Sequence, residues 1–122
     1  MRICILGGDG YLGWPTVMHF SARGHEVVAV DSMIKRHWEA VVDVAPLELT
    51  PPLQDRAAHW YKKTGKVVEV VVGDIATDPE LLHHLFRDYQ PEVIVHYAEQ
   101  PSAPYSMILN SAVTPADLAG FL

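Results

Sequence analysis

The chain has 122 residues, 49% of them hydrophobic, which suits one small domain with a hydrophobic core and excludes a disordered chain. A formal net charge of −6 argues against a general nucleic-acid-binding protein, and no stretch of about 20 apolar residues is present to span a membrane. The lone cysteine, Cys4, cannot form an internal disulfide and no signal-peptide pattern is found, so we expect a cytoplasmic protein.

Four apolar runs alternate with helical patterns along the chain. Strands are expected at residues 2–6, 26–31, 67–72 and 93–96. Helices are expected at 11–23, within 33–44, at 53–63 before Gly65, from the cap Asp78 and Pro79 to Tyr89, and at 115–121. In the first helix the residues expected to face the core are Leu12, Val17, Met18 and Phe20. The alternation predicts an α/β fold, a Rossmann-type doubly wound parallel sheet with helices on both faces, truncated after the fourth strand.

A glycine-rich turn joins the first strand to the first helix. Gly7, Gly10 and Gly13 have the spacing of a dinucleotide-binding loop, in which they serve a tight turn, the approach of a pyrophosphate and close helix packing. The loop also fits a second reading of the motif, Gly8-x-Gly10-x-x-Gly13. A glycine motif alone is weak evidence, but the strand before this turn and the helix after it are the context that a phosphate site requires.

Distinctive residues also follow the other strands. Asp31 ends the second strand, where its carboxylate can accept hydrogen bonds from the adenosine ribose and repel a 2′-phosphate, which favours NAD over NADP. The basic pair Lys35-Arg36 keeps NADP open, because a cation there can neutralise that phosphate. After the third strand, Asp74 can bind the adenine amine and Ile75 can pack on the ring. The alternatives are a solvated acid at Asp31 and an ordinary strand-to-helix turn at Asp74.

The histidines and most aromatic residues are interpreted as structural. His96 ends the fourth strand and is expected to be packed and hydrogen-bonded rather than catalytic. The seven histidines show no metal-ligand spacing, so we predict no metal site. The aromatic residues expected to be packing residues, rather than a stacking platform for nucleic acid, are Trp14, Trp38, Trp60 and Tyr61.

Four motifs occur along residues 1–108, on either side of and within an insert at about 33–65. They are Gly7-Gly8-Asp9-Gly10-Tyr11-x-Gly13-Trp14, Thr64-Gly65-Lys66, Val72-Gly73-Asp74-Ile75 and Glu99-Gln100-x-Ser102-Ala103-Pro104-Tyr105-Ser106-Met107-Ile108. Through these motifs the chain resembles the extended short-chain dehydrogenase/reductase family of NAD-dependent nucleotide-sugar epimerases and dehydratases, and within it the UDP-sulfoquinovose synthases.

This resemblance implies a tightly held NAD and a nucleotide-sugar substrate of the UDP-glucose type, to which sulfite is joined. The cofactor-binding residues that it implies are Gly7, Asp9, Gly10, Tyr11, Leu12, Gly13, Asp31, Ser32, Arg36, Asp74, Ile75, Tyr97, Ala98 and Glu99. The residues implied to face the substrate are Gln100, Ser102 and Tyr105.

The chain departs from the family pattern at two points. Pro101 stands where the family has an arginine, which leaves open a different nucleotide-sugar epimerase or dehydratase. No Tyr-x-x-x-Lys occurs, so we expect no turnover by the chain alone, and a non-catalytic NAD-binding module is a further alternative. We expect residues 1–110 to be the NAD-binding part, 111–122 a divergent tail, and the sugar-nucleotide domain to be absent. Association as a homodimer or through the exposed fourth strand is also expected.

Overall fold

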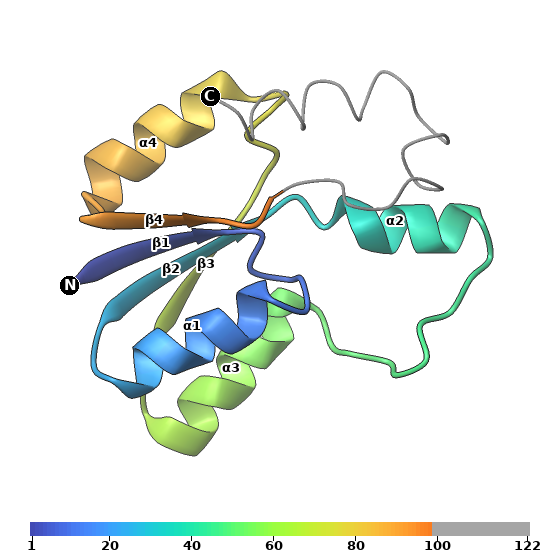
Figure 1. The fold of residues 1–122 in the computed structure, drawn as a ribbon, viewed down its shortest axis with the longest axis horizontal. Helices are drawn as coiled ribbons and strands as arrows, with labels where there is room; N and C mark the ends of the chain where they lie inside the picture. Colours follow the sequence, from blue (N-terminus) through green and yellow to red (C-terminus); the bar gives the residue numbers. More distant parts are fainter. Residues whose placement is uncertain (99–122) are drawn as a thin grey trace.

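A parallel sheet forms the centre of the molecule. The computed structural model describes residues 1–98, so the expected helix at 115–121 lies outside the described residues. The strands are β1 (Arg2–Leu6), β2 (Glu26–Asp31), β3 (Val68–Val72) and β4 (Val93–His96), and they are arranged in the order β3-β2-β1-β4 (Figure 1). Every pairing between neighbours is parallel, which confirms the predicted Rossmann-type sheet.

Helices connect the strands close to where the sequence predicts them. They are α1 (Gly13–Ala22), α2 (Ile34–Val41), α3 (Leu53–Thr64) and α4 (Pro79–Tyr89). The glycine turn delays the start of α1 to Gly13, and Gly65 ends α3 in the left-handed conformation. Asp78 occupies the N-cap position of α4, but the predicted side-chain cap is wrong, because the Leu81 N–H donates to the Asp78 carbonyl instead. None of these described helices is long and apolar enough to cross a membrane.

Successive strand residues face opposite sides of the sheet, and helices cover both sides. Ile3 and Ile5 of β1 belong to a cluster with residues of α1 and α3, whereas Cys4 and Leu6 belong to a cluster with Leu85 of α4. Figure 1 shows α1 and α3 on one side of the sheet and α4 on the other. Cys4 is buried, and this burial raises the pKa of its thiol to about 11.

Most of the predicted core residues are in the core, and two are not. Val17 is fully buried, and Met18 and Phe20 pack against the same cluster. Leu12 is 50% exposed because it precedes the first residue of α1, where helical periodicity does not yet set its direction. Tyr61 is 56% exposed and shares the outer side of α3 with its lysine neighbours, so its prediction as a packing residue is wrong.

The other predicted packing aromatics lie where the sequence placed them. Trp14 and Trp38 are buried, and Trp60 packs against the cluster beneath α1 and α3. The Trp60 Nε1–H donates to the buried Ser21 hydroxyl at 2.9 Å. This bond ties α3 to α1 on one face of the sheet.

The packing of α4 gives a testable prediction. Leu85→Ala should lower the free energy of unfolding by about 3 kcal/mol, because the side chain is 2% exposed and its removal leaves a cavity against the sheet. Phe86→Ala, one residue along and 42% exposed, should cost less than about 1 kcal/mol. Urea unfolding followed by circular dichroism measures both, and equal losses would contradict this assignment of the α4 face.

Candidate functional site

The loops that follow all four strands meet at one edge of the sheet. Leu6 is in register with Val30 of β2 and with His96 of β4, so the parallel strands end side by side. Backbone hydrogen bonds then join the loops: the Gly7 N–H donates to the Val30 carbonyl at 2.7 Å, and the Tyr97 N–H donates to the Leu6 carbonyl at 2.8 Å. The predicted site residues within 1–98 are therefore brought to the carboxyl edge, where open parallel sheets bind ligands.

The glycines of the turn have different local surroundings. Gly7 adopts a φ of +89°, and a Cβ there would lie 2.7 Å from the Tyr97 carbonyl carbon. A Cβ on Gly13 would run into the Gly7 carbonyl, so the first turn of α1 can form only with glycine at that position. A Cβ on Gly10 meets only the Gly7 carbonyl oxygen, at 3.4 Å. The fold therefore requires glycine at 7 and 13 but leaves room at 10.

Asp31 lies at the centre of this edge. Its Oδ2 accepts the Asp9 N–H at 2.9 Å and its Oδ1 accepts the Met33 N–H at 2.8 Å. Burial raises the pKa of this carboxyl group, and the two N–H donors only partly oppose that effect. A carboxylate in such surroundings is stabilised by further hydrogen-bond donors, which is the chemistry that recognises a pair of hydroxyl groups.

A buried ion cluster, which we call the Asp9 cluster, consists of Asp9, Arg36 and Arg56. Arg36 of α2 donates through Nε to Asp9 Oδ2 at 2.6 Å and through Nη2 to Oδ1 at 2.9 Å. Arg56 of α3 donates through Nη2 to the same Oδ1 at 2.6 Å and to the Asp9 carbonyl oxygen at 2.8 Å. The side chain of Asp9 is only 9% exposed. Its carboxylate is therefore held by two cations from the insert.

The Asp9 cluster changes the interpretation of Arg36. The sequence suggested a base that neutralises a 2′-phosphate, but this guanidinium also donates to the carbonyls of Thr50 and Pro51, both at 2.9 Å. The bond to Asp9 also raises the pKa of Arg36. Arg56 is not among the residues that the sequence predicts for the site, so its role was missed. Asp9, a buried acid between two glycines, requires a cationic partner, but no sequence spacing predicts which arginine or lysine supplies it.

The remaining predicted residues surround this edge. Asp74 Oδ1 accepts the Ala76 N–H at 2.9 Å, as in an ordinary turn, and Ile75 packs against the cluster under α4. Ser32 Oγ accepts the Ile34 N–H at 3.3 Å. Tyr11 and Tyr97 are exposed, whereas Ala98 packs against the cluster under α4. The predicted site residues Glu99, Gln100, Ser102 and Tyr105 lie outside the described range. Pro101 also lies outside it.

His96 is hydrogen-bonded through one ring nitrogen, in agreement with a structural role. Its Nδ1 accepts the Ala98 N–H at 3.1 Å, so the neutral ring carries its proton on Nε2. That Nε2 is buried and has no hydrogen-bond partner among residues 1–98.

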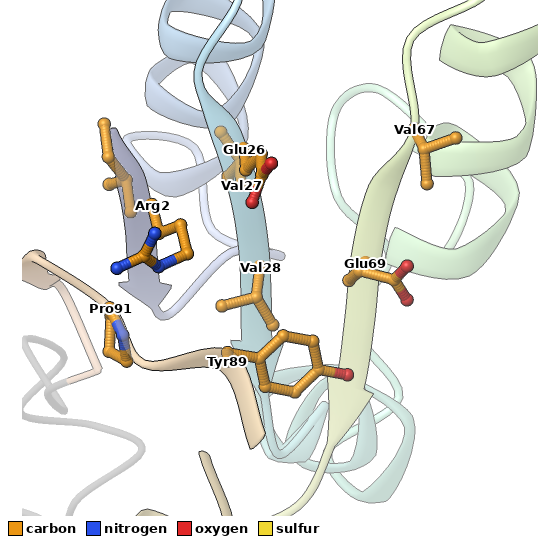
Figure 2. Close-up of a pocket in the computed structure, with 9 residues that line it drawn as sticks. Arg2, Glu26, Val27, Val28, Val67, Glu69, Tyr89 and Pro91 are labelled. Atoms are coloured by element: carbon orange, nitrogen blue, oxygen red, sulfur yellow. The ribbon is translucent and has the colours of Figure 1, made fainter. Parts of the chain in front are cut away.

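A cavity of about 190 Å³ lies at the opposite edge of the sheet, where the strands begin. Figure 2 shows Tyr89 pointing toward β3 beside Val28, with Arg2 and Glu26 nearby. Burial and the negative charges of Glu69 and Asp88 raise the pKa of Tyr89. None of the predicted site residues within 1–98 lines this cavity, so it is separate from the described part of the candidate site.

Comparisons with known proteins agree with this geometry. A model of the NAD dependent epimerase/dehydratase family matches residues 3–122. The chain is 39% identical over 110 residues to a chloroplastic UDP-sulfoquinovose synthase of Spinacia oleracea, a match that covers 90% of this chain and 23% of the spinach protein. It is 41% identical over 108 residues to a UDP-sulfoquinovose synthase of Sulfolobus acidocaldarius, covering 88% of this chain and 27% of that protein. The chain thus spans about a quarter of these relatives' length.

A solved structure also resembles this fold. The UDP-glucose 4-epimerase of Thermus thermophilus, in complex with NAD, superposes with a TM-score of 0.65 and is 25% identical. The match covers 98% of this chain and 31% of that chain.

The turn geometry gives a second testable prediction. Gly13→Ala should lower the free energy of unfolding by about 3 kcal/mol, because its Cβ is forced into the Gly7 carbonyl and the helix must move away from the loop. Gly10→Ala should change it by less than about 0.5 kcal/mol, since only one ordinary contact forms. Thermal and urea unfolding compare the two variants, and a loss at Gly10 as large as that at Gly13 would contradict the geometry.

Proposed function

Since the chain belongs to the NAD dependent epimerase/dehydratase family, we propose that residues 1–98 form the NAD-binding part of an enzyme that modifies a nucleotide sugar. The observation that carries this proposal is Gly10. Within residues 1–98 a Cβ there would meet only the Gly7 carbonyl oxygen, so the described fold does not require glycine at this position. A ligand that must approach the backbone closely gives a reason for glycine at this position, and a pyrophosphate is such a ligand.

The other residues at this edge supply the remaining contacts that the dinucleotide needs. In the proposal, Gly7, Gly10 and Gly13 surround the pyrophosphate, and the carboxylate of Asp31 accepts the adenosine ribose hydroxyls. Asp74 and Ile75 hold the adenine, and Tyr97 and Ala98 line the nicotinamide side. NAD supplies a reversible hydride acceptor when bound. Because Arg36 is held by Asp9 and Asp31 is negative, we propose NAD rather than NADP.

The finer proposal is that the parent activity joins sulfite to a UDP-glucose-derived sugar to give UDP-sulfoquinovose. The identities of 39% and 41% with two UDP-sulfoquinovose synthases support it. The insert at about 33–65, which is part of the resemblance to those synthases, supports it too. The sugar-facing roles of Gln100, Ser102 and Tyr105 remain part of this proposal.

The second candidate is an epimerase or dehydratase of another nucleotide sugar. Pro101 favours it, because arginine at that position would offer a fork of donors to a sulfonate or phosphate and proline offers none. The structural likeness to a UDP-glucose 4-epimerase is compatible with either candidate. The domain limits, the homodimer and the cytoplasmic location stay predictions from the sequence.

Cofactor binding gives a third testable prediction. The 122-residue chain should bind NAD with micromolar affinity, and NADP about tenfold more weakly. Gly10→Ala should weaken NAD binding by at least about tenfold without unfolding the chain, because the added methyl occupies the space of the pyrophosphate. Phe86→Ala on α4 is the control and should bind NAD as the parent chain does. Isothermal titration calorimetry makes these measurements, and the absence of NAD binding by the parent chain would refute the proposed function.

The reaction gives a fourth prediction. The chain, produced with all sequence that lies in frame with it, should convert UDP-glucose and sulfite to UDP-sulfoquinovose. The 122 residues alone should show no turnover, because they contain no Tyr-x-x-x-Lys. Product analysis by mass spectrometry and chromatography separates the two candidates. Formation of UDP-galactose from UDP-glucose, with no product that depends on sulfite, would favour the epimerase.

A further inference from the structure

The Asp9 cluster holds the main chain of the glycine loop as well as a side chain. The Asp9 N–H donates to Asp31 Oδ2 at 2.9 Å, and the Asp9 carbonyl accepts Arg56 Nη2 at 2.8 Å. Both peptide groups of this residue are therefore fixed by side chains from other elements. Asp9 directly precedes Gly10, so fixing these peptides also fixes the direction in which the following N–H groups point.

The two arginines contribute differently. Arg36 holds the Asp9 carboxylate through two of its nitrogens, but none of its bonds reaches the Asp9 main chain. Arg56 binds both the carboxylate and the main-chain carbonyl with the same Nη2. Arg56 is therefore the member of the cluster that couples the insert to the loop backbone.

The surroundings of Arg56 include one favourable contact and one unfavourable feature. The favourable contact is with Trp14 in the first turn of α1, where the guanidinium carbon lies 5.1 Å from the centre of the ring; the Arg56 side chain is 14% exposed. Its Nε is buried and has no hydrogen-bond partner in the described part of the chain. A buried donor without a partner is destabilising. The hydrogen bonds of Asp9 are therefore made while one donor of Arg56 is left without a partner.

We propose that Arg56 is a positioning residue, which holds the glycine loop in the shape that receives the cofactor pyrophosphate. The insert thereby sets cofactor affinity through its two hydrogen bonds from Arg56 to Asp9. This inference rests on the proposed function for the identity of the ligand. Its geometric part, that Arg56 holds the backbone of the glycine loop, does not depend on any ligand.

A purely structural role would predict something different. Trp60 also ties α3 to α1, but its side-chain hydrogen bond goes to Ser21 and not to the loop. Loss of either tether should lower stability, whereas only loss of Arg56 should change the loop. Trp60→Phe is therefore the matched control for Arg56→Met, which keeps an unbranched apolar side chain at position 56.

The experiment measures binding of NAD, ADP-ribose and adenosine to each folded variant of the 122-residue chain, by calorimetry or by NMR titration. Arg56→Met should weaken NAD and ADP-ribose by about tenfold or more and leave adenosine unchanged, since only the first two contain a pyrophosphate. Arg36→Met should have a smaller effect, Arg56→Lys should recover part of the affinity, and Trp60→Phe should have none. Equal weakening of all three ligands by Arg56→Met, or of none, would overturn the proposal.

Amide hydrogen exchange tests the geometric part without any cofactor. In Arg56→Met, or in Arg56→Lys if the first variant fails to fold, the N–H groups of Asp9 and Gly10 should exchange at least about tenfold faster, while those of α4 keep their rates. Trp60→Phe should leave the two loop rates unchanged. Unchanged loop exchange in a folded Arg56 variant would refute the positioning role even if the parent chain bound NAD. Absence of NAD binding by the parent chain, with faster loop exchange in the variant, would refute only the proposed function.

Discussion

The close contact between Gly13 and the Gly7 carbonyl is the constraint on which this architecture depends. It forces α1 to begin directly against the end of β1, so the helix lies close to the sheet and its free N–H groups point to the carboxyl edge. Gly7 in turn donates its N–H to Val30 and lies against the Tyr97 backbone. One tight turn therefore fixes a helix, two neighbouring strands and the loop after a third.

Charge reinforces what this steric constraint begins. The backbone N–H of Asp9 donates to the carboxylate of Asp31, and the two acids are balanced by Arg36 and Arg56. Removing one partner of a buried ion pair is strongly destabilising, and this applies most directly to Asp9, whose side chain is 9% exposed. The cluster connects the β1 turn to an insert that follows β2. The insert thus helps to hold the glycine loop in place through Arg36 and Arg56.

The sequence predicted the strands, the helices and the edge at which they meet, because periodicity and glycine punctuation are local signals. It failed where the answer depends on contacts distant in the chain. Arg56 lies 47 positions from Asp9, and no local sequence pattern near either residue predicts their hydrogen bond. Leu12 and Tyr61 have apolar character but point to solvent, since the helix start and its orientation are set by packing. Asp78 has the expected position, yet a backbone bond replaces its side-chain cap.

The segment between α2 and α3 has a consequence for how the chain can be divided. Leu47 and Leu49 within it are almost fully exposed, so few contacts would be lost if the chain were cut there. Such a cut would leave Arg36 on one fragment and Arg56 on the other, while Asp9 binds both. The Arg56–Asp9 ion pair would then lie between the two fragments, together with the Trp60–Ser21 hydrogen bond and the pairing of β3 with β2 and of β4 with β1.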